Sequence, residues 1–363
     1  MAVETTKKDQ EVVEIDHRRA KLPPSWIEWL KKPFGEKMPR KAKPRQAFGL
    51  VLPMIGKWEP RVVVFDADLA ESTYTKYFRD YQEDGKYLFR HRFFEMGIAE
   101  QSMMATAGGM STTGLIPFIT SYAQFLTSRA LDQARNTVDY TNLNVKIVAS
   151  HAALSVGEDG PSHQSMEDLS NMCAVVNTTV LVPADYWEAA RITAWAVRHQ
   201  GPVYFRMPRC DLEIVTKPDD TFVYGEPTLM REGDDVAIVA TGSMVAIALH
   251  GAEILAQQGI EARVYNFHTI KPINEEALVR AAQECGAIVT VEEHNIWGGL
   301  GSIVARVLML RDVHVPMRIV AINNQYLTSG PFEHLWEIAG LTPENVAKKA
   351  REAVERKVKA TTA

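Results

Sequence analysis

Glutamate, aspartate and histidine side chains meet in one short loop, residues 154–164 (LSVGEDGPSHQ). An apolar run over residues 143–149 precedes the loop and predicts a buried strand, and a helix-like stretch that opens with Glu167 and Asp168 follows it. Enzymes with α/β folds place their chemistry in loops at the exits of such strands. Because His163 is suited to proton transfer near neutral pH, the loop is a candidate proton-transfer site.

The segments around this loop alternate between β-branched runs and helical spacing of apolar residues. The expected strands cover residues 62–65, 116–120, 145–149, 180–182, 203–206, 236–240, 262–267, 288–291 and 317–322. The expected helices cover residues 47–55, 96–110, 121–138, 168–173, 186–199, 244–258, 274–285 and 302–310, with a last helix after Thr342-Pro343. Such alternation predicts an α/β fold with a parallel sheet covered on both faces. Asp185 is placed to cap the helix over residues 186–199.

With 363 residues, the chain is long enough for two domains, each with its own core. Polar, turn-forming residues at 216–228 predict a linker between a domain over 46–215 and a smaller domain over 229–363. Residues 1–45 are interpreted as a charged tail followed by an arm that mixes tryptophans, prolines and lysines. The arm either lies on a surface, such as that of a partner, or is an irregular lead-in to the first helix.

Composition excludes several classes of function. The 40 basic and 45 acidic residues leave a net charge of −5, which does not favour nucleic-acid binding. No apolar run is long enough to span a bilayer, and the N-terminus lacks the pattern of a secretory signal. The cysteines Cys173, Cys210 and Cys285 have no zinc-site spacing, and a reduced, cytoplasmic protein is expected.

Four segments, taken in order, resemble one family. They are residues 94–101 (FEMGIAEQ), 121–125 (SYAQF), the loop at 154–164 and residues 201–209 (GPVYFRMPR). From about residue 45 to the end, the chain resembles the C-terminal two-thirds of a transketolase, as found in split enzymes whose N-terminal part is a separate chain. The resemblance implies a parallel-sheet domain that binds the pyrimidine of thiamine diphosphate, followed by a smaller α/β transketolase C-terminal domain.

The resemblance implies that three residues hold the cofactor. Glu100 matches the glutamate that shares a proton with the aminopyrimidine ring, a role that needs a carboxyl in mostly apolar surroundings. Tyr122 and Phe125 match the aromatic residues that stack on this ring, and their spacing suggests one face of a helical turn. Without the resemblance, Glu100 would be a helix-surface acid and the two rings ordinary core residues. Ser128 departs from the family pattern, since many transketolases have a third aromatic residue there.

Further residues match positions that face the sugar substrate. His163 would exchange protons with substrate hydroxyls, and Asp159 would bind a hydroxyl or orient the loop. Asp68 matches a position near the cofactor or the substrate hydroxyls. The positions that bind the substrate phosphate are matched by Ser72, His151 and Arg209, more loosely by Arg45, and with Arg206 as a further neighbour. Singly, each of these residues would be interpreted as a turn residue, a cap or a surface ion pair.

The diphosphate half of the family's cofactor site is missing from this sequence. The family binds Mg²⁺ and the diphosphate with a Gly-Asp-Gly segment and a later asparagine, and the chain has no Gly-Asp-Gly. No metal ligand is therefore expected here. The resemblance implies a partner chain, the N-terminal (alpha) subunit, that supplies the Mg²⁺ ligands in an α₂β₂ assembly, with the helix over 121–138 at the interface. His268 and His294, in the second domain, are interpreted as structural.

The expected function is that of the beta-type subunit of a transketolase, which transfers a two-carbon ketol unit from a ketose phosphate to an aldose phosphate. Two other thiamine enzymes of the same build stay open: a 1-deoxyxylulose-5-phosphate synthase and the beta subunit of a 2-oxoacid dehydrogenase. A non-catalytic scaffold subunit is the alternative from another class. Pentose phosphates are the default substrates, although a modified or sulfonated sugar would fit the same residues.

Overall fold

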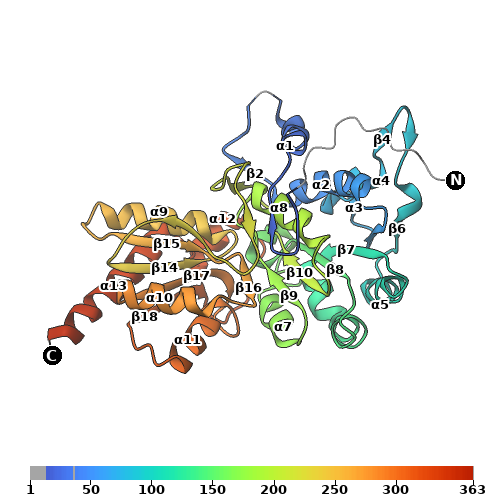
Figure 1. Ribbon diagram of the computed structural model, residues 1–363. Coiled ribbons are helices and arrows are strands. Elements are labelled where there is room, and N and C mark those ends of the chain that lie inside the picture. The colour runs from blue at the N-terminus through green and yellow to red at the C-terminus, as the bar shows by residue number, and fades with distance from the viewer. Residues whose placement is uncertain (1–13, 36, 363) are drawn as a thin grey trace.

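Two β-sheets, one in each half of the chain, form the centre of the structure (Figure 1). The computed structural model describes residues 14–35 and 37–362. Much of the predicted tail therefore lies outside the described residues. None of the helices in the described part of the chain has the length and apolar character that a membrane crossing requires.

The first sheet has the strand order β16-β9-β10-β8-β7-β3-β6. Its strands are β3 (Val62–Asp66), β6 (Phe93–Glu95), β7 (Ile116–Tyr122), β8 (Lys146–Ser150), β9 (Thr179–Leu181), β10 (Val203–Arg206) and β16 (Thr269–Lys271). All neighbours are parallel except β16, which runs antiparallel to β9. Helices α2 (Pro44–Trp58) and α8 (Tyr186–Ala196) cover one face, and α5 (Glu100–Ser111) and α7 (Asp168–Ala174) cover the other (Figure 1).

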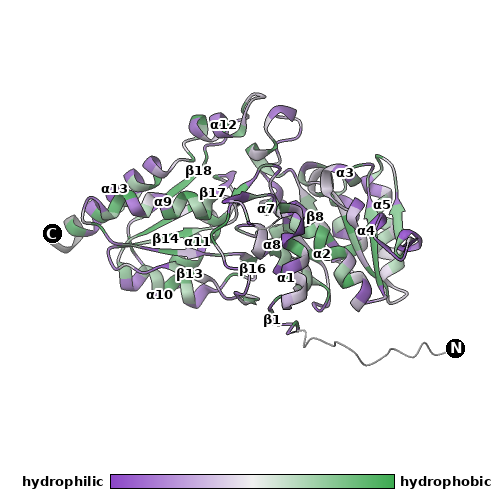
Figure 2. Cartoon of the chain, turned by 90° about the horizontal axis from the view of Figure 1, so that it is seen from above, coloured by the Kyte–Doolittle hydropathy of each residue, from purple (hydrophilic) through white to green (hydrophobic). Residues whose placement is uncertain are grey.

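Strand alternation explains why both faces are covered. Along β3, Val62 and Val64 pack in the core with α2 and α8, whereas Val63 and Phe65 pack with the other face. A strand that is apolar on both sides must be buried on both sides, as parallel strands are. Figure 2 shows apolar residues along the strands and mixed polar and apolar residues on the helices.

The second sheet has the order β13-β15-β14-β17-β18. Its strands are β13 (Thr228–Arg231), β14 (Val236–Ala240), β15 (Ala262–Asn266), β17 (Ile288–Asn295) and β18 (Met317–Ile322), of which β13 alone is antiparallel to its neighbour. Helices α9 (Met244–Ala256) and α13 (Pro343–Thr362) cover one face, and α10 (Glu275–Cys285) and α11 (Leu300–Leu310) the other. The predicted α/β fold class is confirmed.

Short α-helices and strands lie between these elements, along with 3₁₀ turns at Lys32–Phe34 and Arg90–Arg92. The helices are α1 (Pro24–Lys31), α3 (Ala70–Thr73), α4 (Lys76–Arg79), α6 (Leu131–Gln133) and α12 (Phe332–Ala339). The two-residue strands are β1 (Arg19–Ala20), β2 (Lys41–Ala42), β4 (Gln82–Glu83), β5 (Lys86–Tyr87), β11 (Leu212–Glu213) and β12 (Phe222–Val223). The described part of the arm lies on its own chain, because β1 pairs with β12, β2 pairs with β11, and Trp26 and Leu30 of α1 join the core over α2.

Two expected helices differ from the structure. The helix expected over 96–110 begins only at Glu100, because Gly97 adopts a positive φ of 68° that interrupts the backbone ahead of it. The helix expected over 121–138 was wrong at its start, where Ser121 and Tyr122 complete β7. The rest of that segment is broken into π-helical turns at Phe125–Arg129 and Ala134–Asp139.

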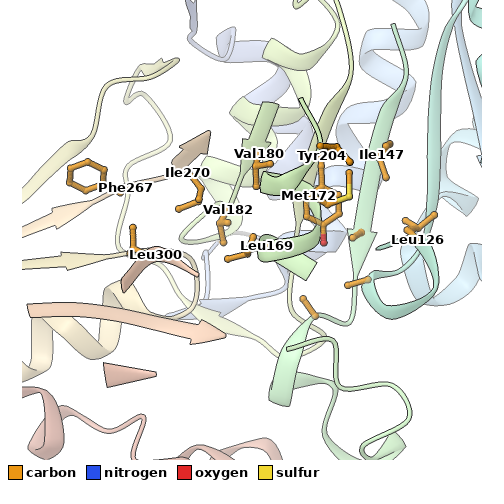
Figure 3. Close-up of a cluster of buried hydrophobic side chains, with 14 of the residues drawn as sticks. Leu126, Ile147, Leu169, Met172, Val180, Val182, Tyr204, Phe267, Ile270 and Leu300 are labelled. Carbon is orange, nitrogen blue, oxygen red and sulfur yellow. The ribbon is translucent and has the colours of Figure 1, made fainter. Parts of the chain in front are cut away.

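The two halves share a continuous core. Phe267, Ile270 and Leu300 from the second half belong to the same buried cluster as Leu169 and Val182 from the first half (Figure 3). Strand β16 adds a backbone connection, since it comes from the second half but closes the edge of the first sheet. The halves are therefore held in one relative orientation.

Asp185 fastens the linker to the first half. Its fully buried carboxylate caps α8 by accepting from Glu188 N–H at 2.9 Å, as the sequence predicts. It also accepts from the backbone N–H groups of Val215 and Thr216 at 2.8 and 2.6 Å, and from the Thr216 hydroxyl at 2.8 Å. One carboxylate thus satisfies three backbone donors that would otherwise be unpaired.

Asp185→Ala should lower the free energy of unfolding by about 3 kcal/mol, because it removes a helix cap and leaves buried N–H donors without an acceptor. Urea unfolding followed by circular dichroism measures the change. Asp219→Ala, at an exposed position in the same linker, should stay within about 0.5 kcal/mol of the parent. Equal effects of the two substitutions would contradict the anchoring role of Asp185.

Candidate active site

A pocket of about 480 Å³ opens where β3 and β7 end. It gathers every residue that the sequence predicts to contact the cofactor ring or the sugar hydroxyls. These lining residues are Asp68, Glu100, Tyr122, Phe125, Asp159 and His163, accompanied by Ala67, Leu69, Ile98 and Arg129. Side chains that are far apart in the sequence thus meet at the carboxyl edge of the sheet, where α/β folds bind ligands.

Glu100 is the first residue of α5 and is only 1 % exposed, so it is not a helix-surface acid. Its carboxylate accepts a hydrogen bond from the Ser121 hydroxyl at 3.2 Å and pairs with the Arg129 guanidinium at 2.8 Å. The expectation of mostly apolar surroundings did not include these two polar partners. A buried carboxylate needs a compensating charge or donors, and the chain supplies both.

Two aromatic rings form one wall of the pocket. Tyr122 is the last residue of β7, and Phe125 opens the π-helical turn that follows, so they do not share one helical turn as expected. Their ring centres are 6.0 Å apart with the planes at 16°. The guanidinium of Arg129 lies 4.3 Å from the centre of the Phe125 ring, which is a cation–π contact.

The loop after β8 brings an acid and an imidazole to the same pocket. The His163 ring meets Phe125 edge-on at 5.2 Å, and its Nδ1 shares a hydrogen bond of 2.9 Å with the Ser162 hydroxyl. Asp159 lies at the end of short 3₁₀ turns over Ala153–Asp159, which Gly157 interrupts with a φ of 73°. Both side chains therefore line the pocket from one loop, and His163 contacts the aromatic wall.

Two of the predicted phosphate-binding residues, Arg45 and Arg209, are connected to each other, and Arg209 also contacts this loop. Arg45 donates hydrogen bonds to the backbone carbonyls of Ser72 and Arg209, and is itself only 8 % exposed. Arg209 donates to the Val156 carbonyl at 2.9 Å and pairs with the Glu158 carboxylate at 2.8 Å. Arg45 thus links the backbones of Ser72 and Arg209. Glu158 is a partner that sequence reasoning did not assign to Arg209.

Arg206 lies elsewhere. It forms a buried ion pair with Asp168 at 2.7 Å and donates to the Glu293 carbonyl at 2.7 Å, so it is a structural residue and not a neighbour of the phosphate-binding residues. His268 and His294 are also buried, 1 % and 0 % exposed. The Nδ1 atom of His294 bonds to the Asn295 carbonyl at 2.7 Å. Their surroundings agree with the structural interpretation of both histidines.

His151 connects the two groups of residues. Its ring stacks on Tyr122 with centres 3.9 Å apart, and its Nδ1 bonds to the Ser150 hydroxyl at 2.9 Å. Burial, reinforced by the positive charges of Arg45 and Arg209 and by His163, lowers the pKa of His151 to about 2. The imidazole is therefore neutral at physiological pH and contributes to the site as a flat, hydrogen-bonding ring.

Two residues that organise the pocket escaped the sequence analysis. Asp66, at the end of β3, accepts from Leu69 N–H and from the hydroxyls of Thr73 and Thr75, and its burial raises its pKa to about 6. The sequence signal for Asp66 was its position directly after the β-branched run of β3, where a strand ends and site residues are common. Arg129 had no such signal, because its contact with Glu100 depends on the π-helical turn.

Replacement of Arg129 should destabilise the chain through Glu100. Arg129→Leu is expected to lower the free energy of unfolding at pH 7 by about 2 kcal/mol. The loss is smaller than for a fully buried ion pair, because the Arg129 side chain is 45 % exposed and solvent screens its charge. The double variant Arg129→Leu/Glu100→Gln should recover most of this loss, as a double-mutant cycle in urea would measure. Arg135→Leu, at an exposed position nearby, is the control. Additive single effects would show that the pair is not coupled.

The neutral state of His151 predicts a pH dependence. Below pH 6.5 the unfolded chain protonates this histidine and the folded chain does not, so its contribution to stability falls with falling pH. Between pH 7.5 and 5.0, His151→Asn should therefore lose about 2 kcal/mol less unfolding free energy than the parent. Asparagine tolerates the positive φ of 56° at this position.

His250 provides the opposite control. Its hydrogen bond to Glu213 raises the pKa of its imidazole, so the proton stabilises the folded chain below the unfolded pKa. His250→Asn should accordingly lose more stability than the parent on acidification. If both variants follow the parent between pH 7.5 and 5.0, the assignment of a neutral His151 fails.

Two family models match the chain: the transketolase pyrimidine-binding domain over residues 40–214 and the transketolase C-terminal domain over residues 225–346. A transketolase C-terminal section from Methanocaldococcus jannaschii is 40 % identical over 86 % of this chain and 96 % of its own length. A 6-deoxy-6-sulfo-D-fructose transketolase subunit from Clostridium sp. (strain MSTE9) is 39 % identical over 82 % of this chain and 90 % of its own length. A 1-deoxy-D-xylulose-5-phosphate synthase from a Synechococcus strain is 35 % identical over 88 % of this chain but only 49 % of its own length.

Among solved structures, a split-gene transketolase described as an inactive β4 tetramer is 42 % identical, with a TM-score of 0.79 and coverage of 87 % of this chain and 99 % of that one. The transketolase of Pichia stipitis, in complex with a sugar phosphate, shares the fold at 22 % identity and a TM-score of 0.71 over 48 % of its length. The matches cover both halves of the chain and the segments that form the pocket. The chain belongs to the transketolase family.

Proposed function

We propose that this chain is the C-terminal subunit of a two-chain transketolase that transfers a two-carbon ketol unit from a ketose phosphate to an aldose phosphate. One observation carries the proposal: a buried carboxylate, two parallel aromatic rings and a loop with an aspartate and a histidine line a single pocket. Ketol transfer needs a cofactor ring and a sugar side by side. The carboxylate and the aromatic rings suit the cofactor ring, and the aspartate and histidine of the loop suit the sugar.

The pocket fits the aminopyrimidine end of thiamine diphosphate. Tyr122 and Phe125 offer flat apolar faces for a heteroaromatic ring, and Glu100 is a buried carboxylate that can hold a proton against a ring nitrogen. When bound, the cofactor supplies the electron sink that stabilises the carbanion-like state formed as the C–C bond breaks. Ser121 and Arg129 orient the Glu100 carboxylate, because each donates to one of its oxygens.

The loop after β8 would act on the sugar. We infer that His163 exchanges protons with substrate hydroxyls and that Asp159 accepts a hydrogen bond from one of them. Asp68, an exposed residue that also lines the pocket, would bind another hydroxyl. The turn after Asp66 keeps Asp68 there, since Glu95 accepts from the Asp68 N–H at 2.6 Å.

A phosphate on the substrate would bind at Arg209, with Arg45, His151 and Ser72 in support. Arg209 is the most accessible of the two arginines, with 38 % of its side chain exposed, and its guanidinium already binds carboxylates. A phosphate would replace Glu158 at this guanidinium, because a dianion that binds bidentately competes well with one exposed carboxylate. Pentose phosphates are the default substrates.

The proposed enzyme needs a second chain. No Gly-Asp-Gly segment occurs in this sequence, so we assign the diphosphate and Mg²⁺ ligands to an N-terminal subunit in an α₂β₂ assembly. Two relatives are described as a C-terminal section and as a subunit, and the split-gene relative is described as an inactive β4 tetramer. Ile98, 76 % exposed at the pocket, is an apolar residue that a second chain would cover. The free thiols of Cys173, Cys210 and Cys285 suit a cytoplasmic location.

A 1-deoxyxylulose-5-phosphate synthase is the second candidate, favoured by the 35 % identity to such an enzyme. The two candidates differ in the donor: a ketose phosphate for ketol transfer, and pyruvate for the synthase. Assays of the reconstituted pair with each donor, and with a sulfonated ketose, would separate them. A scaffold subunit predicts no effect of pocket substitutions on the activity of the assembly.

Glu100→Gln should lower the ketol-transfer rate of the reconstituted enzyme about 10²–10⁴-fold, because an amide cannot share a proton as the carboxyl does. Steady-state kinetics with a ketose phosphate donor and an aldose phosphate acceptor measure the loss. Glu71→Gln, an exposed glutamate in the first turn of α3, is the matched control and should keep full activity. Unchanged activity of Glu100→Gln would contradict the catalytic assignment.

A further inference from the structure

The loop that carries Asp159 and His163 is held by the second half of the chain. The N–H of Ser155 donates to the Glu293 carboxylate at 2.7 Å. The Ser329 hydroxyl donates to the Glu158 carbonyl at 2.5 Å, and the Gln164 side-chain amide donates to the Thr328 carbonyl at 3.1 Å. Three contacts, at the start, middle and end of the loop, thus reach residues that lie more than a hundred positions away in the sequence.

Glu293 is the buried member of this set. It lies on β17, is 2 % exposed, and accepts from three donors on different elements. Besides Ser155 these are the Ser243 hydroxyl at 2.7 Å, just before α9, and the Trp336 indole N–H at 2.9 Å on α12. The carboxylate therefore fixes the loop to a rigid strand and to two helices at once.

Two loop glycines fit against the same part of the second half. Gly157 and Gly160 have φ values of 73° and 77°, a region that side chains with a Cβ disfavour. A Cβ on Gly157 would lie 3.5 Å from the Gly330 carbonyl oxygen, and one on Gly160 would lie 3.5 Å from Ser329. The backbone of the loop at these glycines thus lies close to the segment before α12.

We propose that Glu293 is a positioning residue, and that through Ser155 it sets the place of the loop bearing Asp159 and His163 in the pocket. Its consequence for catalysis rests on the proposed function, but the mechanical role does not. The second half of the chain then takes part in building the active site and does more than complete the fold. A loop held at one end by a buried acceptor loses its alignment when that acceptor is removed, and small misplacements of reacting groups reduce rates strongly.

Hydrogen exchange of the full-length chain tests the positioning role without any assay of function. Glu293→Met keeps the length of the side chain but removes its acceptors, so amides in peptides covering residues 153–164 should exchange about tenfold faster. Glu293→Gln should restore the slow exchange, because its carbonyl can still accept from Ser155 and Trp336. Unchanged exchange in Glu293→Met would overturn the proposal.

Glu292 offers a matched control on the same strand. It is equally buried, but it accepts from the N–H groups of Leu300 and Gly301 at the start of α11 and has no contact with the loop in the described chain. Glu292→Met should speed exchange around residue 300 and leave residues 153–164 unchanged. Faster loop exchange in both variants would mean general destabilisation and would also overturn the proposal.

A surface variant guards against a misfolded Glu293→Met chain. Ser329→Ala removes the middle contact at an exposed position, and should speed exchange at residues 157–160 about threefold to tenfold. In the assembly with the partner subunit, Glu293→Met should lower kcat about 10- to 100-fold, and Glu293→Gln should recover most of it. Slow loop exchange combined with a normal kcat in these variants would refute the positioning role. Faster loop exchange in an assembly that shows no ketol transfer would refute only the proposed function.

Discussion

A fully buried ion pair between Asp168 and Arg206 is the interaction on which the site depends. The two side chains are 0 % and 4 % exposed and meet at 2.7 Å, and the Tyr204 hydroxyl donates to the second carboxylate oxygen at 2.5 Å. Arg206 uses its other amino group on the backbone of Glu293. The pair joins β10, the first turn of α7 and β17, and so links elements of the two halves of the chain. Charges buried so deeply are tolerated only when each finds its partners, so this junction permits one arrangement of the two halves.

The same principle shapes the pocket. Glu100 is buried in the wall of the pocket, and Arg129 supplies the charge that makes this burial tolerable. The Arg129 guanidinium also lies over one face of the Phe125 ring, so the same residue packs against two members of the pocket. The chain thus carries its own partner for this carboxylate, since buried charge without a partner is costly.

Much of the fold could be predicted because its strands are marked by short apolar runs in the sequence. The segments 203–206, 236–240 and 317–322 are short β-branched or apolar runs between turn residues, and β10, β14 and β18 have those bounds. The cap at Asp185 could be predicted because capping is local. The residues of the pocket could be proposed from a family resemblance, whereas local pattern alone would have left Glu100 and Phe125 as surface and core residues.

The remainder depended on contacts that no local pattern records. The π-helical turns after Tyr122 are stabilised by packing against α5 and α7, so the apolar spacing of residues 121–138 predicted an ordinary helix. Glu100, the partner of Arg129, lies 29 positions away in the sequence, and Ser155, a partner of Glu293, lies 138 positions away. Such pairings are set by tertiary structure, which a single sequence shows only through resemblance.

Strand β16 has a consequence for how this chain could be divided. Its residues come from the second half, but Thr269 and Lys271 pair with Leu181 and Val180 at the edge of the first sheet. A cut in the linker would strip β9 of this cover and present a row of unpaired backbone groups, which is a template for joining another molecule edge to edge. The two halves are therefore unsuited to separate expression. A gene fission at this point would produce fragments that aggregate through the exposed strand edge, and not two independently folding domains.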